Sequence, residues 1–324
     1  MPIPVVDLSR FDADTGTATL AAQALDRHCR DVGFFLVSGH GVPDAAIASV
    51  WGATRAFFAL PLEAKQAVGM GLGEPYGYGG FLHERLSASQ GVVTAPDLKE
   101  TFSMGPPDAA ERGDEGGEAA AFCFRPTPWP PDPIGFQEAM LAYYAAMERL
   151  AARLMRAMAC ALALPPDWFN SRIDRHVSAM RLIHYPPLDQ AVPADQWRAG
   201  AHTDYGSLTI LLPQAGRSGL EVQTPDGHWL PVPDQPGTFV VNLGDLMATW
   251  TNDRWRSTLH RVRADTPPVP SRLSIAFFHQ PNWDADIAAL PGCVTEDRPA
   301  RYPTTQSGAH LMAKFHQANA AAGG

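Results

Sequence analysis

The chain has 324 residues, of which 45% are hydrophobic and 18% are charged, and its formal net charge is −9. This composition is typical of a globular protein, and the acidic balance argues against a nucleic-acid partner, because such binding depends on Lys and Arg neutralising phosphates. No apolar run approaches the roughly 20 residues of a membrane span, so we expect no membrane partner.

The N-terminus and the cysteines bear on the cellular compartment. The opening sequence MPIPVVDLSRFDAD has no charged segment followed by an apolar one, so we expect no secretory signal. The four cysteines lie far apart and form no C-x-x-C motif, which favours reduced thiols: Cys29, Cys123, Cys160 and Cys293. A cytoplasmic location and a monomer or weak homo-oligomer are predicted.

The first half of the chain predicts a mixed α/β region. IPVVDLS and GFFLVSG have the character of strands, and helices are expected over residues 18–32 and near residues 43–58. The glycine-rich stretch 71–80 predicts a loop, and the Pro-, Gly- and acid-rich stretch 105–133 predicts a surface excursion. A long amphipathic helix follows over about 135–163 and ends before a Pro-Pro pair.

From about residue 178 to residue 282 the pattern changes to short strands. GLEVQTPDGHWLPV predicts two strands around an Asp226–Gly227 turn, and SLTILLPQ, TFVVNLG and SRLSIAFFHQP predict three more. Such spacing favours a β-sandwich or jelly roll. We predict one structural unit made of an N-terminal α/β bracing region (1–175), a jelly-roll core (176–285) and a C-terminal tail with a helix (286–324).

Two histidines and one aspartate have the spacing of a metal site. His202 and Asp204 form an H-x-D motif, and residues two apart in an extended segment point to the same side. His260 follows 56 residues after Asp204, once the predicted hairpin and strand have returned the chain. Two imidazoles and one carboxylate form the facial triad of non-haem Fe(II) oxygenases. The alternative is a surface turn at HTDYG with an unrelated histidine.

Arg272 and Ser274 lie just past His260, two residues apart in the predicted strand SRLSIAFFHQP. A guanidinium with a hydroxyl beside it is suited to bind a carboxylate, and a buried arginine in an apolar strand needs an anion. The alternative is an inter-strand salt bridge to an acid such as Asp245.

The combination H-x-D, H and R-x-S resembles the 2-oxoglutarate/Fe(II)-dependent dioxygenases related to isopenicillin N synthase. The resemblance runs nearly end to end, through IPVVDLS, GFFLVSGHGV, FFALPLEAK, DLKETFSMG, MRLIHYPP, NLGDLMATWTNDRWRSTLHRV and RYPTTQSGAHLMAKF. It implies a mainly β fold with flanking helices, built on a double-stranded β-helix (jelly-roll) core. It also implies Fe(II) on His202, Asp204 and His260, and the C5 carboxylate of 2-oxoglutarate on Arg272 and Ser274.

Tyr185 matches a tyrosine that often hydrogen-bonds the same carboxylate, whereas Ile183 stands where many relatives have Asn. The resemblance further implies that 2-oxoglutarate and O₂ are consumed, that succinate and CO₂ are released, and that a small-molecule metabolite is hydroxylated, desaturated or cyclised. Because the cofactor carries this chemistry, no catalytic base is expected.

The substrate pocket is expected to be formed by inward-facing side chains and by loops over the mouth of the jelly roll. The candidates are Tyr78, Phe102, Tyr205, Phe278 and His279. Core packing is the alternative role for each aromatic residue. Glu100, in DLKETF, is a further candidate for binding a substrate amine or hydroxyl.

Two other functions fit the motifs. One is an Fe(II) oxidase on the same scaffold that uses no 2-oxoglutarate, because relatives of that kind retain H-x-D, H and R-x-S. The other is a jelly roll that binds a ligand without turnover, which should show a broken triad or carboxylate site. Both motifs are intact here.

Overall fold

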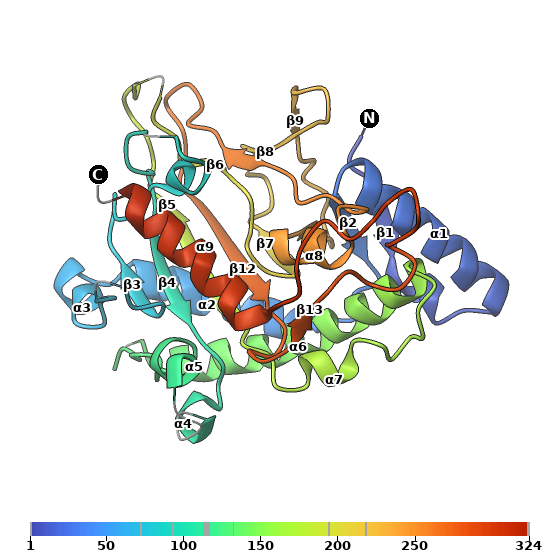
Figure 1. Cartoon of the computed structure of the whole chain (residues 1–324). Coiled ribbons are helices and arrows are strands. Elements are labelled where there is room, and N and C mark those ends of the chain that lie inside the picture. Colours follow the sequence, from blue (N-terminus) through green and yellow to red (C-terminus); the bar gives the residue numbers. More distant parts are fainter. Residues whose placement is uncertain are drawn as a thin grey trace.

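Two β-sheets pack face to face in the middle of the molecule, and helices cover the outer face of the larger one (Figure 1). The computed structural model describes residues 2–322 except 72, 93, 113–116, 132, 194 and 218. Buried residues of both sheets, among them Phe34, Leu36, Val222, Val240 and Val262, share one apolar cluster between the sheets.

The larger sheet has eight strands, and its neighbours are antiparallel except for the parallel pair β1–β2. In spatial order its strands are β1 (Val5–Asp7), β2 (Phe34–Ser38), β10 (Phe239–Leu243), β7 (Leu208–Pro213), β12 (Arg272–His279), β5 (Ala179–Tyr185), β4 (Glu100–Met104) and β3 (Gly77–Gly79). The smaller sheet consists of β6 (Ala199–His202), β11 (His260–Val262), β8 (Leu220–Gln223) and β9 (Trp229–Pro231). A third pair joins β13 (Asp286–Ile287) to β14 (Thr305–Gln306).

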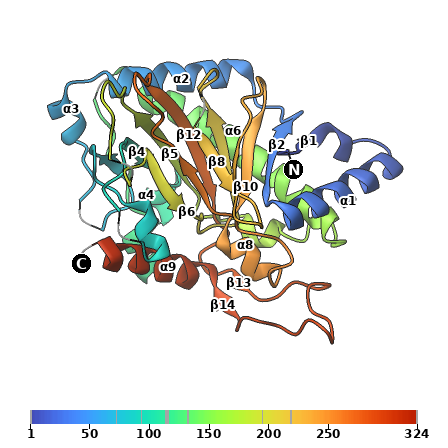
Figure 2. The ribbon, with the colours of Figure 1, turned by 90° about the horizontal axis from the view of Figure 1, so that it is seen from above.

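Helices from the N-terminal half cover the outer face of the larger sheet, as Figure 2 shows for α2 and α6. The helical elements are η1 (Leu8–Phe11), α1 (Thr15–Asp31), α2 (Asp44–Phe58), α3 (Leu62–Gln66), η2 (Leu86–Gln90), α4 (Ala109–Arg112), α5 (Gly117–Phe122), α6 (Phe136–Ala161), α7 (Asn170–Ile173), α8 (Asp245–Trp250) and α9 (Ser307–Ala322). The predicted mainly β fold with flanking helices is therefore confirmed. Among the described residues, we find no helix with both the length and the apolar character needed to cross a bilayer.

The predicted turn at Asp226–Gly227 is confirmed, because β8 and β9 pair in an antiparallel hairpin and Gly227 has a φ of +85°. The prediction of a loop over residues 71–80 is partly wrong, because Gly77–Gly79 form strand β3 beside β4. A Cβ at Gly79 would lie 2.7 Å from Thr101 Oγ1, so the glycine permits this close pairing. The predicted excursion 105–133 contains α4 and α5, and residues 113–116 and 132 lie outside the described part.

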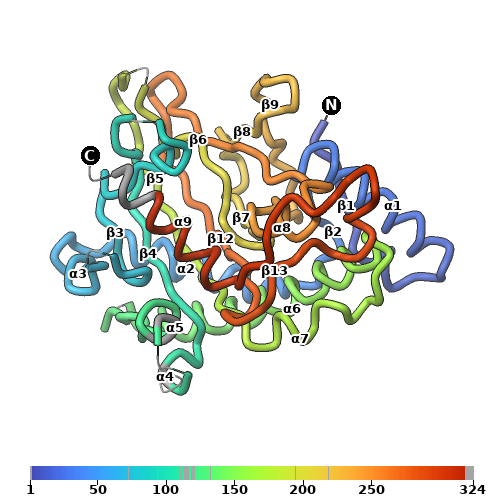
Figure 3. Tube along the Cα trace, in the orientation of Figure 1, coloured from blue at the N-terminus to red at the C-terminus, as the bar shows by residue number. Residues whose placement is uncertain are grey.

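The C-terminal helix α9, which runs across the front of the molecule in Figure 3, contacts η2. Its residues Leu311 and Phe315 line the cavity of the candidate site. Strands from the predicted region 1–175 join the same sheet as strands from the predicted core, since β4 pairs with β5 in antiparallel register. The site therefore draws on the N-terminal, central and C-terminal parts of the chain.

Candidate active site

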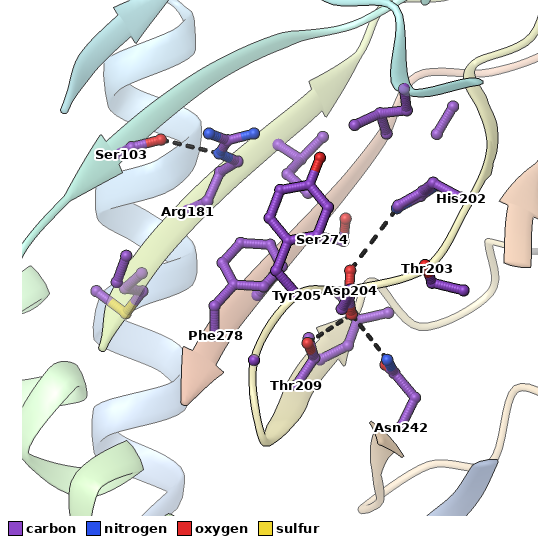
Figure 4. Close-up of a pocket in the computed structure, with 18 of the residues that line it drawn as sticks. Ser103, Arg181, His202, Thr203, Asp204, Tyr205, Thr209, Asn242, Ser274 and Phe278 are labelled. Carbon is purple, nitrogen blue, oxygen red and sulfur yellow. Dashed lines mark hydrogen bonds and ion pairs between the residues drawn. The ribbon is translucent and has the colours of Figure 1, made fainter. Parts of the chain in front are cut away.

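Three side chains converge where β6 and β11 meet at the rim of the smaller sheet. His202 ends β6, Asp204 lies in the turn that follows, and His260 begins β11 opposite His202. The Nε2 atoms of both histidines lie 3.8 Å from Asp204 Oδ1, and one ligand atom from each residue fits within 4.8 Å of the others. Figure 4 shows His202 pointing toward Asp204.

Neighbouring polar groups orient the three side chains. The Nδ1 atom of His202 lies 2.7 Å from Gly200 O, and that of His260 lies 3.1 Å from Thr258 O, so both Nδ1 atoms donate and both Nε2 lone pairs stay free. Asp204 Oδ2 accepts hydrogen bonds from Thr209 Oγ1 (2.5 Å) and Asn242 Nδ2 (2.7 Å). The other carboxylate oxygen, Oδ1, is left to face the two imidazoles.

The protonation states suit metal binding. Burial, reinforced by the nearby His260, lowers the pKa of His202 to about 3. Burial by itself would raise the pKa of Asp204, but His260, His202 and the two hydrogen bonds outweigh it and lower that pKa. A neutral imidazole and an ionised carboxylate are the forms that ligate a metal, so the donor set fits a divalent ion such as Fe(II).

A buried arginine lies near the triad at the start of β12. Arg272 is only 2% exposed, and its Nε and Nη1 atoms have no hydrogen-bond partner among the described residues. It pairs with Tyr185 across β12 and β5, and its guanidinium carbon lies 4.9 Å from the centre of the tyrosine ring. A buried, unpaired guanidinium is costly, so this position fits an anionic ligand.

The alternative salt bridge from Arg272 to Asp245 is wrong. Asp245 instead forms an ion pair with Lys314 of α9 at 2.7 Å. Its carboxylate also accepts hydrogen bonds from Thr203 Oγ1 (3.2 Å) and Ser257 Oγ (2.6 Å). Asp245 therefore contacts both segments that carry the triad, and the guanidinium of Arg272 stays available.

The triad and Arg272 share one cavity of about 230 Å³. Ser274 and Tyr185 also line it, and Tyr185 is the cross-strand neighbour of Arg272. The cavity is smaller than the roughly 300–1,000 Å³ of typical ligand pockets, so it suits a small metabolite.

The comparisons with known proteins agree with this site. Residues 3–132 match the family described as non-haem dioxygenase in morphine synthesis N-terminal, and residues 176–281 match the 2OG-Fe(II) oxygenase superfamily. The chain belongs to the 2-oxoglutarate/Fe(II)-dependent dioxygenases. It is therefore an oxidoreductase that uses Fe(II), 2-oxoglutarate and O₂, as the sequence predicted.

Individual relatives resemble this dioxygenase over most of their length. Validamycin A dioxygenase of Streptomyces hygroscopicus subsp. limoneus is 35% identical, over 96% of this chain and 85% of its own. Homoarginine-6-hydroxylase 2-ODD-C23.1 of Arabidopsis thaliana is 32% identical, over 96% and 92%. A Neurospora crassa protein, solved in complex with alpha-KG and thymine, superposes with a TM-score of 0.84, at 31% identity and with 97% of this chain and 96% of the other covered. These relatives support hydroxylation with 2-oxoglutarate.

Of the five residues proposed for the substrate pocket, Tyr205 and Phe278 line the dioxygenase cavity and three do not. Alternation along the strands explains the difference, because Ser103 faces the cavity while Phe102 faces the helical core. Phe278 likewise faces in, whereas His279 faces the other way and its Nδ1 atom lies 3.0 Å from Ser178 Oγ.

Tyr78 and Glu100 form a separate polar cluster that does not line this cavity. The Tyr78 hydroxyl donates to Glu100 Oε2 at 2.6 Å, and Lys65 Nζ donates to the same oxygen at 2.7 Å. The Nδ1 atom of His184 lies 2.7 Å from Glu100 Oε1. Both oxygens of Glu100 are thus engaged by other side chains. The prediction that Glu100 binds a substrate amine or hydroxyl is therefore wrong.

Several cavity residues were missing from the sequence prediction. Arg181 lies four residues before Tyr185 on β5, so the alternation that places Tyr185 and Ile183 inside predicts it as well. Its Nε atom donates to Ser103 Oγ at 2.9 Å (Figure 4). Gln280 continues the inward register of Arg272 and Phe278. Leu311 and Phe315 of α9 also line the cavity, although they lie far along the chain from the triad. No local sequence pattern predicts that they line it.

Proposed function

We propose that this dioxygenase binds Fe(II) through His202, Asp204 and His260, and the C5 carboxylate of 2-oxoglutarate through Arg272, Ser274 and Tyr185. The observation that carries the proposal is the triad with its free Nε2 and Oδ1 atoms, beside a buried guanidinium that lacks a partner among the described residues. Bound Fe(II) with 2-oxoglutarate supplies O₂ activation, with release of succinate and CO₂.

The protein's own residues perform the positioning. Thr209 and Asn242 fix one oxygen of Asp204 and so aim the other at the metal position. Arg272 fixes the direction of the cosubstrate by a charge-assisted hydrogen bond, and Ser274 adds a hydroxyl on the same side of β12. No side chain is assigned as a catalytic base.

The substrate is a small molecule that enters beside Tyr205 and Phe278. Relatives are named for validamycin A, homoarginine and proline. These compounds differ from one another, so the choice of substrate depends on the walls of this cavity. Hydroxylation is the proposed outcome, with desaturation and ring closure as variants of the same oxidation.

The deciding experiment is an anaerobic titration with Fe(II) and then 2-oxoglutarate, followed through the weak visible charge-transfer band of the chelate. We expect a saturable band that is lost in Arg272→Ala. The half-exposed Arg153, which bonds Gly39 O and Asp12, provides the matched control, because Arg153→Ala should keep the band. Iron binding without a band would favour the 2-oxoglutarate-independent oxidase, and no iron binding would overturn the triad.

We also propose that the chain is organised as residues 1–175, 176–285 and 286–324. We further propose that the protein is cytoplasmic and that it is a monomer or a weak homo-oligomer. Strands from the first region join the central sheet, which supports treating the three regions as one structural unit.

A further inference from the structure

Gln280 lines the cavity just after the end of β12, and its side chain lacks a hydrogen-bond partner among the described residues. The residue is 6% exposed, and no described residue bonds its Oε1 atom. Asn282, two residues further on, is 4% exposed but fully engaged, through Arg175 N (2.7 Å), Ser171 O (3.2 Å) and Asp174 Oδ1 (2.7 Å). Two buried carboxamides therefore lie on one short segment, and only that of Asn282 has hydrogen-bond partners among the described residues.

A buried polar group without a partner lowers stability, and such a group in a cavity wall can be satisfied by a bound molecule. The carboxamide of Gln280 packs against Gly206, where a Cβ would lie 3.0 Å from Nε2. Gly206 follows Tyr205 in the segment after Asp204, and all three residues line the cavity, so Gln280 lies against the segment that carries one member of the triad. A carboxamide can turn either end toward a ligand, and so can accept from an N–H or O–H or donate to a carbonyl.

The charged groups of the cavity wall balance. Apart from Arg272, which we assign to the cosubstrate, the lysine and arginine side chains that line the cavity are Lys99 and Arg181. Lys99 Nζ lies 2.9 Å from Glu84 Oε2 and 3.3 Å from Asp97 Oδ2, and Arg181 Nη1 lies 2.8 Å from Glu84 Oε1. Two cations thus face two carboxylates, and a substrate meets no net charge from these four groups.

Glu84 is ionised within this group. Burial by itself would raise the pKa of its carboxyl, but Arg181 and Lys99 outweigh burial and hold that pKa well below its usual range. Arg181 nevertheless keeps donor capacity, because its Nη2 atom forms no hydrogen bond with a described residue, while Nε and Nη1 are engaged.

We propose that Gln280 is a substrate-contact residue and that, with Arg181, it selects an uncharged small molecule with an amide-type edge, in which an N–H or O–H lies beside a carbonyl. The apolar walls at Tyr205, Phe278 and Leu311 accommodate the rest of the substrate. This inference rests on the proposed function and deepens it.

The first test needs no substrate. Because Gln280 lacks a partner among the described residues, Gln280→Met should leave the Tm unchanged or raise it by about 1–3 °C. Asn282→Leu is the matched control and should lower the Tm by several degrees, because three hydrogen bonds are lost. A fall in Tm for Gln280→Met as large as that for Asn282→Leu would overturn the proposal, since it would make Gln280 structural.

The second test measures succinate formation stimulated by two panels of compounds. One panel holds uncharged amides and imides such as thymine and pyrrolidin-2-one, and the other holds charged compounds such as homoarginine and proline. We expect stimulation from the uncharged panel, and in Gln280→Met a KM for the active compound raised about tenfold or more, with the KM for 2-oxoglutarate changed less than about twofold. Stimulation by the charged panel alone, or by neither, would overturn the assigned class.

Failure of this inference is distinguishable from failure of the proposed function. Succinate formed slowly without any added substrate, together with the anaerobic chelate band, reports on the iron and 2-oxoglutarate site alone. If both signals are present while no uncharged compound stimulates turnover, the substrate assignment is wrong and the metal and cosubstrate assignments stand.

Discussion

Two buried carboxylates in this dioxygenase are bonded in opposite ways. Asp204 bonds Thr209 and Asn242 through Oδ2 only, and its Oδ1 atom faces the Nε2 atoms of His202 and His260. Both oxygens of Glu100, by contrast, have close partners on the side chains Lys65, Tyr78 and His184. A carboxylate that holds a metal keeps one oxygen free of strong donors, whereas one that holds the fold together uses both.

The two clusters also differ in charge. Burial would raise the pKa of Glu100, but hydrogen bonds from His184, Lys65 and Tyr78 lower it to about 2, so its negative charge is balanced locally by Lys65. The triad has no lysine or arginine paired with Asp204 among the described ion pairs. Its negative charge is thus left for a bound cation, which explains why a buried carboxylate is functional in one place and structural in the other.

The largest expected effect comes from removing the functional carboxylate. Asp204→Ala should lower iron-dependent turnover by about 10³-fold or more, because one of three metal ligands is lost. Its Tm should change little, since water in the cavity can bond Thr209 and Asn242 in place of the carboxylate. Asp226→Ala, in the exposed hairpin turn, is the matched control and should retain turnover. Full activity in Asp204→Ala would refute the metal assignment.

Glu100→Ala should have the opposite pattern. It leaves the buried ammonium of Lys65 without its partner, so we expect the free energy of unfolding to fall by about 3–5 kcal/mol. Denaturant titration measures this loss, and the anaerobic affinity for Fe(II) in the folded variant should change less than about twofold. A large loss of Fe(II) affinity with unchanged stability would contradict the structural role assigned to Glu100.

A smaller effect is expected on the KM for the cosubstrate 2-oxoglutarate. Arg272→Ala should raise the KM for 2-oxoglutarate by about 100-fold, because a buried charged hydrogen-bond partner is removed. Fe(II) affinity without 2-oxoglutarate should stay within about twofold, since the guanidinium is no ligand. Steady-state succinate formation and the anaerobic iron titration separate the two quantities, and an unchanged KM would remove Arg272 from the cosubstrate site.

The smallest expected effect is on the pH dependence of stability. Because the pKa of Glu100 is lowered from 4.5 to about 2 on folding, its contribution is present above pH 4.5 and is lost as the pH falls toward 2. We expect Glu100→Gln to remove roughly 1–2 kcal/mol of the acid-induced fall in the free energy of unfolding between pH 5 and pH 3. Denaturant titrations at pH 5 and pH 3 measure it. An equally steep fall in the variant would contradict the ionised state of Glu100.

Strand alternation accounts for what the sequence predicted of the site and for what it missed. H-x-D and R-x-S place their residues on one side of an extended segment, and the same rule would have included Arg181 and Gln280. It would also have excluded Phe102 and His279, which point to the opposite face. Alternation therefore holds along the whole of each strand and not only at its motif.

Other features depend on tertiary packing and could not be read locally. Glu100 lies 35 residues from Lys65 and 84 from His184, and only the pairing of β4 with β5 brings it to the histidine. Strand β3 contains two glycines, which weaken a strand signal, yet the lack of a side chain at Gly79 permits close pairing with β4. The fold class could be predicted because strand periodicity and turn residues are local properties.

The carboxylate of Asp245 links the C-terminal helix to the metal site, and this link bears on how the substrate range of the enzyme can change. It contacts Thr203 and Ser257 on the two metal-bearing segments and Lys314 on α9, whose residues Leu311 and Phe315 form part of the cavity wall. Helix α9 lies beyond residue 281, where the match to the oxygenase superfamily ends. Substitutions in this one helix can therefore reshape the space offered to a new compound while the inherited oxidation chemistry stays intact.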